Sequence, residues 1–336
     1  MILVTGATGL VGSRLVKELV QRGEKIRILA RKSSDRSRIY RVLDRNDGQQ
    51  RSLIEWVEGD VTDVYAVKDA LQGVDRVFHC AGLVNFQPGM AGRLMEVNAD
   101  GTANVVNMAL ESGVSHLVHV SSIAALGRNA DGEHIDESAT WKTSKRNSAY
   151  AVSKYSAERE VWRGVAEGLN AAIVNPGVII GPGNWKTDSS MIYGQVWRGL
   201  RFYTRGITGF VDVADVVKAM LLLSEKRISA ERYVLVSENK SFREVFDGIS
   251  DALGKKRPVV YAGTFLTGLA WRAERIKGLL TGRKPVITRE TAQSAASQYY
   301  YSSNKIRKDF GFEFIPIKTS VEETGKIFVK ELRREK

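Results

Sequence analysis

Hydrophobic residues in the first half of the chain form short, unbroken apolar runs, which alternate with longer stretches that have apolar positions at helical spacing. The apolar runs predict strands at residues 2–5, 25–30, 53–58, 76–79, 117–121 and 171–175. The stretches between them predict helices at residues 10–21, 64–71, 92–111 and 149–167. Because such strands are apolar on both faces, the pattern predicts an α/β fold with a doubly wound parallel sheet of the Rossmann type.

The alternation becomes less regular after residue 175. Hydrophobic spacing there predicts helices at 191–198, 242–253 and 320–332, a strand with a helix within 210–224, and a strand at 233–236. We expect residues 1–175 to form a dinucleotide-binding domain, rejoined by about 208–237. Residues 176–207 and 238–336 are expected to form a smaller C-terminal α/β substrate lobe that closes over the open edge of the sheet.

The composition is ordinary for a soluble globular protein, with 336 residues of which 43% are hydrophobic and 26% are charged. The chain has no apolar run of 18 residues, which argues against a transmembrane helix. The opening residues MILVTG enter a predicted strand at once, so we expect no leader. Cys80 is the only cysteine, which excludes an internal disulfide and favours a cytoplasmic location.

The formal net charge of +12 raises the question of an anionic partner. The basic residues are spread along the chain, with modest clusters at 31–45, 272–284 and 330–336. No nucleic-acid-binding motif accompanies them. We therefore interpret most of this charge as solvated surface and predict no nucleic-acid partner.

A glycine-rich stretch, TGATGLVG, follows the first strand and leads into a helix. Glycine permits a tight turn and lets the backbone approach a pyrophosphate, which then meets the positive end of the helix. The alternative is a glycine turn with a purely structural role, but its place at the start of an alternating pattern favours a dinucleotide site. The predicted contacts are Gly6, Thr8, Gly9, Leu10, Val11 and Gly12.

The end of the second strand bears on which dinucleotide is bound. An NAD site usually has an acidic residue there, which accepts from the ribose hydroxyls. This chain has Arg31 and Lys32 instead. Arg31 can stack on adenine and pair with a 2′-phosphate, so the sequence favours NADP(H) over NAD(H). The alternative is that both side chains are merely exposed on a basic loop.

The ends of the third and fourth strands carry weaker signals. The Asp60 carboxylate, which is followed by Val61, can accept a hydrogen bond from the adenine amino group. It can equally be a turn-forming aspartate. Cys80, Ala81 and Gly82 are small, which lets a cofactor pass close by, although tight packing explains small residues equally well.

Tyr150 and Lys154 lie four residues apart near the start of a predicted helix, so both side chains can point into the same space. A neighbouring ammonium favours the phenolate and lowers the pKa of a phenol toward neutral pH. This spacing is also common on an ordinary amphipathic surface helix, so on its own it is a weak signal.

Seven short motifs occur in order along the chain: TGATGLVG, GDVTD, HCAG, NADGTANV, VSSIAALG, YAVSK and NPGVIIGPG. Together they resemble the extended short-chain dehydrogenase/reductase family, in its epimerase/dehydratase branch. The resemblance covers nearly the whole chain, strongly through Gly183 and more loosely afterwards. It implies that the Tyr150 and Lys154 pair is catalytic rather than an ordinary surface feature.

The resemblance implies a role for each matching residue. Tyr150 would be the general acid/base that exchanges a proton with the substrate oxygen. Lys154 would hold the nicotinamide ribose and help to lower the pKa of Tyr150. Ser122 would hydrogen bond to the same substrate oxygen, and Asn98 would support the geometry of the site.

The resemblance also implies further contacts and a partner. Tyr150 and Lys154 would touch the cofactor themselves. In this family the helices that match 92–111 and 149–167 often pair across a dimer interface, so we expect a homodimer. Additional cofactor contacts are implied at Ser121, Pro176, Gly177 and Val178.

The substrate is less well defined by the sequence. Nucleotide-sugar members of the family usually carry Arg-Asp before a Phe-Val segment, whereas here Thr208 and Gly209 precede Phe210. FVDVADVVKAM and the C-terminal segments look more like the dihydroflavonol 4-reductase branch, which also includes 3β-hydroxysteroid-type enzymes and aldehyde reductases. The favoured function is an NADP(H)-dependent oxidoreductase acting on a carbonyl or secondary alcohol of a small lipophilic substrate. The alternatives are a sugar epimerase or dehydratase and a non-catalytic NADP-sensing protein.

Two remaining features have ordinary interpretations. The four histidines show no metal-ligand spacing and Cys80 has no cysteine partner, so no metal site is predicted. Residues 262–283 have an apolar helical face with basic residues elsewhere, which we interpret as packing on the lobe rather than contact with an anionic membrane or a lipophilic substrate. That face consists of Phe265, Leu266, Leu269, Ala273, Ile276 and Leu280.

Overall fold

The computed structural model describes residues 1–43, 48–127, 134–144, 147–263, 271–272, 288 and 296–334, without the side chains of 48 and 49. The apolar face predicted within 262–283 lies outside the described residues. Within the described part of the chain, no helix is long and apolar enough to cross a membrane.

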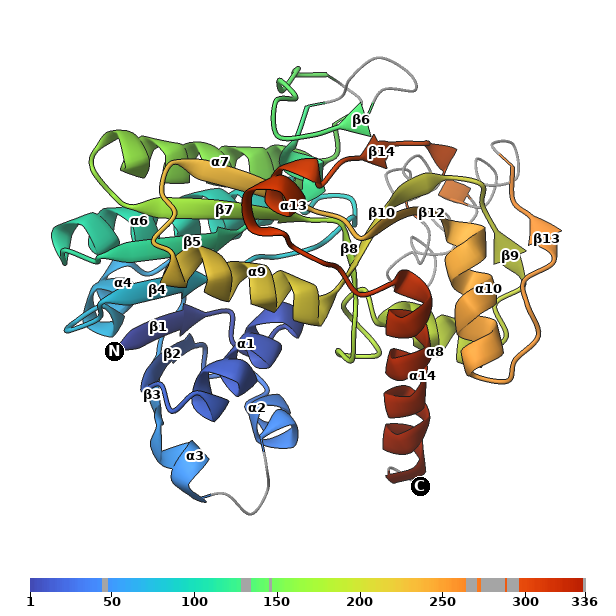
Figure 1. Cartoon of the computed structure of the whole chain (residues 1–336), viewed down its shortest axis with the longest axis horizontal. Helices are drawn as coiled ribbons and strands as arrows, with labels where there is room; N and C mark the ends of the chain where they lie inside the picture. Colours follow the sequence, from blue (N-terminus) through green and yellow to red (C-terminus); the bar gives the residue numbers. More distant parts are fainter. Residues whose placement is uncertain are drawn as a thin grey trace.

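A seven-stranded parallel sheet forms the centre of the larger domain (Figure 1). Across the sheet the strands are β11 (Glu231–Leu235), β7 (Ala171–Pro176), β5 (His116–Val120), β4 (Arg76–His79), β1 (Ile2–Thr5), β2 (Ile26–Ala30) and β3 (Ile54–Glu58). The strand order reverses between β1 and β4, and doubly wound sheets bind ligands at the carboxyl ends of strands beside such a point. The predicted Rossmann-type sheet is therefore confirmed.

Helices cover both faces of this sheet (Figure 1). One layer contains α1 (Leu10–Gln21) and α9 (Val213–Glu225), and the other contains α4 (Val64–Ala70), α6 (Gly101–Glu111) and α7 (Ala149–Ala166). Along β1, Ile2 and Val4 enter the core under the first layer, whereas Leu3 enters the core under the second. Burial on both faces explains why the strand has no polar alternation. Two short helices, α2 (Ser37–Val42) and α3 (Gly48–Ser52), connect β2 to β3.

The single helix predicted at 92–111 consists of three consecutive segments. These are α5 (Ala91–Leu94), a π-helical turn η1 (Met95–Asp100) and α6. A π-helical segment of six residues is too short to be distinguished in a hydrophobic pattern, so the sequence predicted one continuous helix. Asn98 lies in this turn and is 1% exposed. Val105 on α6 and Val161 on α7 are buried in the core between the sheet and these helices.

The smaller lobe is built on a three-stranded sheet in the order β12 (Glu238–Ser241), β10 (Ile207–Asp212) and β8 (Val178–Ile180). Its core is completed by α8 (Met191–Trp197), α10 (Phe242–Ala252) and α14 (Ile317–Arg334). The remaining elements are β6 (His134–Ile135) paired with β14 (Tyr300–Tyr301), β9 (Phe202–Tyr203) paired with β13 (Val260–Tyr261), the 3-10 turn η2 (Ile123–Ala125) and α13 (Asn304–Phe310). We propose that the chain crosses back to the larger domain after Asp212, because α9 packs on α1 and β11 joins the main sheet.

Candidate active site

The glycine loop between β1 and α1 leaves no space for side chains at two of its positions. A Cβ atom at Gly6 would lie 2.5 Å from the Cys80 carbonyl carbon, and one at Gly12 would lie 2.3 Å from the Gly6 carbonyl oxygen. Gly6 also has a φ of +66°, a conformation that favours glycine. Gly9 is the N-cap of α1, and no side chain caps the helix there. The loop therefore fits the phosphates of a dinucleotide, which would meet the N-terminal N–H groups of α1.

Some of the basic side chains after β2 are exposed, and others form contacts within the protein. Arg31 and Lys32 are exposed, as the sequence analysis allowed. Arg38 on α2, which the sequence analysis did not single out, is largely buried at the junction of the two lobes. Its guanidinium donates to the carbonyl oxygens of Thr8 (3.4 Å) and Pro182 (3.3 Å).

The salt bridge of Arg38 reaches the smaller lobe. Its partner is Asp188, at 3.3 Å. Asp188 in turn accepts from the backbone N–H of Asn184 (2.7 Å) and of Ser190 (3.1 Å). Arg38 thus ties the glycine loop to the loop that precedes α8. In the sequence, the cluster of basic residues at 31–45 is the only sign of this link.

The small residues at the ends of β3 and β4 lie where the sequence analysis expected them. Asp60 accepts from the backbone N–H of Thr62 (3.1 Å), the geometry of a turn-forming aspartate. A Cβ atom at Gly82 would lie 3.4 Å from the Asn98 Oδ1 and 3.7 Å from the Lys154 Nζ. Burial raises the pKa of Cys80 to about 12, so this thiol stays protonated at neutral pH.

Tyr150 and Ser122 come together from different elements. Ser122 follows β5 and caps η2, while Tyr150 lies in the first turn of α7, which Ser148 caps. The Ser122 hydroxyl lies near the Tyr150 phenol and acts to lower its pKa. Phe86, from the loop after β4, packs its ring edge-on against Tyr150 with the centroids 5.5 Å apart. No pattern in the sequence indicated this aromatic contact.

The pKa of Tyr150 departs from the sequence-based expectation. Burial raises it, and the nearby Ser122 hydroxyl only partly opposes that effect. The predicted lowering by Lys154 is wrong in this structure, because the Lys154 ammonium donates to the Val120 carbonyl oxygen (2.8 Å) on β5. Burial also lowers the pKa of Lys154 to about 8, against the opposing effects of Glu158 and Cys80.

Asn98 joins the loop after β4 to the start of α7. Its Oδ1 accepts from the Leu83 backbone N–H (2.6 Å), and its Nδ2 donates to the Leu83 carbonyl oxygen (3.0 Å). The same Nδ2 donates to the Ser153 hydroxyl (2.9 Å), which donates to the Tyr150 carbonyl oxygen (2.8 Å). The π-helical turn thus places an amide that orients the backbone bearing Tyr150.

A buried hydrogen-bond chain through His79 reaches the same asparagine. The Ala81 N–H donates to the Thr5 hydroxyl (3.2 Å), which lies 2.7 Å from the His79 Nδ1. On the other side, the His79 Nε2 lies 2.9 Å from the Thr102 hydroxyl, which donates to the Asn98 carbonyl oxygen (2.5 Å). A neutral histidine protonated on Nε2 satisfies every group in this chain. Burial lowers the pKa of His79 to about 3, which agrees with that neutral form.

Two further predicted contacts lie at the carboxyl edge of the sheet. Ser121 follows β5, is 5% exposed, and its hydroxyl has no hydrogen-bond partner among the described residues. A buried hydroxyl without a partner is the kind of group that a bound ligand satisfies. Gly177 follows β7 at Pro176, and a Cβ atom there would lie 2.4 Å from the Gly209 carbonyl oxygen. The close approach of β8 and β10 therefore explains this glycine without a ligand.

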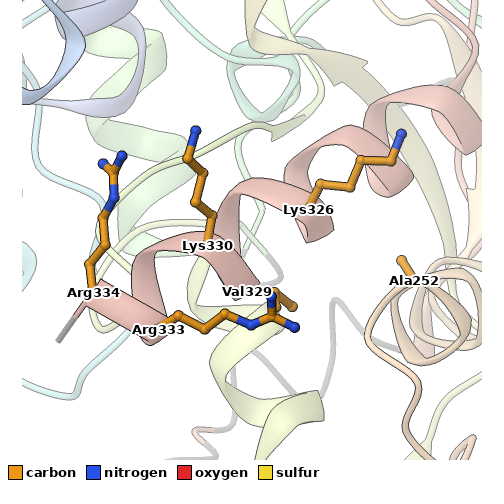
Figure 2. Close-up of a pocket in the computed structure, with 6 residues that line it drawn as sticks. All are labelled: Ala252, Lys326, Val329, Lys330, Arg333 and Arg334. Atoms are coloured by element: carbon orange, nitrogen blue, oxygen red, sulfur yellow. The ribbon is translucent and has the colours of Figure 1, made fainter. Parts of the chain in front are cut away.

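A cavity of about 450 Å³ lies away from these residues, between α10 and α14 of the smaller lobe (Figure 2). It is lined by Ala252, Lys326, Val329, Lys330, Arg333 and Arg334, none of which is a candidate site residue. Across the described ranges, no group of three or more His, Cys, Asp or Glu side chains is arranged to hold a metal ion.

The comparisons with known proteins show the family of this chain. The model of the NAD dependent epimerase/dehydratase family matches residues 2–235. The chain belongs to this family. It is 31% identical to the “Putative dihydroflavonol 4-reductase” of Synechocystis sp. (95% of this chain, 91% of the relative). It is 33% identical to the sterol demethylase protein B of Methylococcus capsulatus (76% of this chain, 75% of the relative).

A solved structure has the same fold over nearly the full length of this chain. The crystal structure of gox2253 is 32% identical, superposes with a TM-score of 0.81, and is matched over 98% of both chains. The resemblance to the extended short-chain dehydrogenase/reductases, in the dihydroflavonol 4-reductase-like branch, is confirmed. The protein is accordingly an NAD(P)-dependent enzyme of the oxidoreductase type.

Proposed function

We propose that the protein is an NADP(H)-dependent oxidoreductase that interconverts a carbonyl and a secondary alcohol on a small lipophilic substrate. The observation that carries this proposal is the convergence of Ser122, Tyr150 and Lys154 at the carboxyl edge of the sheet, where η2 after β5 packs on α7. Two hydroxyls on one side of a site suit the binding of a single carbonyl oxygen.

The residues around this pair fit a nicotinamide dinucleotide. The glycine loop leaves backbone space for a pyrophosphate, Gly82 leaves space beside Lys154, and Ser121 has an unsatisfied buried hydroxyl. Gly6, Gly9 and Gly12 would hold the phosphates, and Lys154 would bind the ribose hydroxyls after leaving the Val120 carbonyl oxygen. The cofactor, when bound, supplies or accepts the hydride.

The chain's own contribution is proton transfer and charge stabilisation. Because burial raises the pKa of Tyr150, the phenol is protonated at neutral pH and can donate a proton to a carbonyl oxygen. Ser122 donates a second hydrogen bond to the oxygen as its negative charge develops. With its pKa at about 8, Lys154 remains largely protonated at pH 7, so its ammonium can donate to the ribose hydroxyls.

The substrate class follows from the surroundings of Tyr150 and from the relatives. Phe86 packs on Tyr150, and Trp141 stacks on Tyr155 of the same helix with the ring centroids 4.4 Å apart. Aromatic side chains of this kind suit an apolar, ring-bearing substrate. The names of the two curated relatives, a dihydroflavonol reductase and a sterol demethylase protein, both refer to polycyclic compounds.

Nucleotide-sugar chemistry is disfavoured by the packing before Phe210. A Cβ atom at Gly209 would lie 2.4 Å from a methyl carbon of Val236, so this position has no space for a side chain. The acidic residue expected there in nucleotide-sugar members therefore does not fit. NADPH absorbance should fall with aryl ketones, aldehydes or sterol ketones and stay constant with nucleotide sugars. Turnover of nucleotide sugars without net cofactor use would overturn the proposal.

The preference for NADP(H) is tested by reversing the charge of Arg31, which follows β2. Arg31→Asp should weaken NADPH binding by about 10–100-fold, the loss expected for a charge-assisted contact with the 2′-phosphate, and should change NADH binding much less. Isothermal titration of both cofactors measures this difference. Lys308→Asp makes the same charge change at an exposed position on α13 and should affect neither cofactor. Equal affinities of the unchanged protein for the two cofactors would contradict the preference.

A further inference from the structure

Two segments of the smaller lobe, residues 197–205 and 254–261, lie side by side and form what we call the β9–β13 surface. β9 and β13 pair in parallel, with Phe202 opposite Val260. The backbone N–H groups of Val259 and Val260 both donate to the Arg201 carbonyl oxygen. This surface lies at the end of the molecule that is far from the seven-stranded sheet (Figure 1). It is therefore remote from Tyr150 and the glycine loop.

Large apolar side chains are exposed together on this surface. Val259 is 80% exposed, Phe202 is 50% exposed and Tyr261 is 45% exposed. Single exposed hydrophobic residues are common and need no explanation. Of the twelve large hydrophobic side chains that are exposed within the described ranges, however, five belong to these two short segments. They are Trp197, Phe202, Val259, Val260 and Tyr261.

Positive charge surrounds the exposed apolar side chains. The two segments contain six basic residues and no Asp or Glu: Arg198, Arg201, Arg205, Lys255, Lys256 and Arg257. Of these, Arg257 is paired with Asp251, which lies just outside the surface. The Arg205 guanidinium lies over the Tyr261 ring (4.4 Å), and the Lys255 ammonium lies over the Trp197 ring (3.8 Å). The surface thus combines cations with exposed apolar side chains in the same two segments.

The basic cavity lies between α10 and α14 (Figure 2). Ala252 lines the cavity and lies three residues before Lys255. Trp197 packs against Phe328 of α14, with ring centroids 5.9 Å apart, so this helix adjoins the surface. The α14 side of the cavity adds the cations Lys330, Arg333 and Arg334, whereas Lys326 is paired with Glu323. Positive potential therefore extends beyond the two segments themselves.

We propose that the β9–β13 surface docks the protein on an anionic lipid bilayer. Val259, Val260 and Phe202 would enter the boundary between headgroups and acyl chains, while the surrounding cations contact the lipid phosphates. Nucleic acid would use the cations but would gain nothing from the exposed valines. A second copy of the chain would place two positively charged surfaces face to face, which charge repulsion opposes. This inference is independent of the proposed reaction.

Vesicle sedimentation with the full-length protein tests the proposal. Vesicles of equal parts phosphatidylcholine and phosphatidylglycerol should bind the protein at least tenfold more tightly than phosphatidylcholine alone. About 1 M NaCl, at which the Debye length is ~3 Å, should remove most of that difference. Comparable binding to both kinds of vesicle, or to neither, would overturn the proposal.

Paired variants separate the apolar and the electrostatic contributions. Val259→Ser with Val260→Ser, and separately Lys255→Glu with Lys256→Glu, should each weaken binding to anionic vesicles about tenfold or more. Turnover of a soluble carbonyl should be unchanged, since these residues are remote from Tyr150. Tyr65→Ser with Lys308→Glu changes an exposed tyrosine and an exposed cation elsewhere and should bind as the unchanged protein does. If the valine variant instead turned a dimer into a monomer without affecting vesicle binding, the surface would be a contact between copies.

Discussion

Replacing Tyr150 with phenylalanine is expected to lower kcat for carbonyl reduction by about 10²–10⁴-fold, the range typical of a general acid. The change removes one oxygen atom, which lies near the Ser122 hydroxyl, and leaves the ring that packs against Phe86 in place. NADPH affinity and the free energy of unfolding should therefore change little. Steady-state kinetics with the best carbonyl substrate, combined with cofactor titration, measure both effects.

Tyr155→Phe is the matched control for this prediction. Tyr155 lies on the same helix, but its ring stacks on Trp141 rather than contacting Ser122. Loss of its hydroxyl should change kcat by no more than a few-fold. If Tyr150→Phe retained the kcat of the unchanged protein, the phenol would not be the proton donor, and the assignment of the site would be wrong.

The free energy of unfolding is expected to fall steeply as the pH drops below about 6.5, the ordinary pKa of an unfolded histidine. His79 and His119 are both fully buried, and their rings stack with the centroids 5.1 Å apart. Burial lowers the pKa of His79 to about 3 and that of His119 well below its ordinary value, and the charge of Lys154 adds to both shifts. Both rings stay neutral in the folded protein while the unfolded chain takes up protons. Stability is thus present above pH 6.5 and is lost as the pH falls toward the folded pKa values.

The size of this effect follows from proton linkage. Each histidine that is neutral when folded and charged when unfolded contributes about 1.4 kcal/mol per pH unit, so the pair contributes ~2.7 kcal/mol per unit below pH 6. Urea unfolding at pH 7, 6 and 5 measures the slope. Because the structure gives neither ring nitrogen of His119 a partner among the described residues, His119→Leu should reduce the slope by its own share of about 1.4 kcal/mol per pH unit, without loss of stability at pH 7.

Val118→Ala provides the control for the histidine prediction. Val118 is a fully buried neighbour on β5 without a titratable group. Its truncation should lower stability by a similar amount at every pH and leave the slope unchanged. A His119→Leu variant with the original slope would mean that this histidine does not titrate as burial requires.

The sequence predicted those parts of the fold that depend on continuous hydrophobic patterns. The strand at residues 2–5 and the helix at 10–21 have the predicted bounds, because burial on both faces of β1 and on one face of α1 leaves a clear pattern. The short helices α2 and α13 were missed, since each is about two turns long or less and has one fully buried residue. The pairing of β9 with β13 joins residues far apart in the sequence, and no local pattern predicts such a contact.

The candidate site, like the fold, was predicted only where short sequence patterns are informative. Tyr150 and Ser122 were predicted because their motifs resemble those of the family, and the glycine loop was predicted because it follows a strand and leads into a helix. The contacts of Arg38 and the hydrogen-bond chain through His79 depend on distances between separate elements, so the sequence did not reveal them. The direction of the Tyr150 pKa was predicted wrongly for a related reason. Helical spacing shows that a lysine is near, but it does not show that the tyrosine is partly buried or that a carbonyl oxygen holds the lysine.

The structure of the protein in complex with NADPH is the most direct test of the central claim. The account predicts that the nicotinamide ring lies beside Tyr150 and Ser122, with space for one carbonyl oxygen within about 3 Å of both hydroxyls. Lys154 should have exchanged the Val120 carbonyl oxygen for the ribose hydroxyls. A nicotinamide bound away from this edge, with Tyr150 still enclosed by protein and out of reach of a shared substrate, would contradict the account.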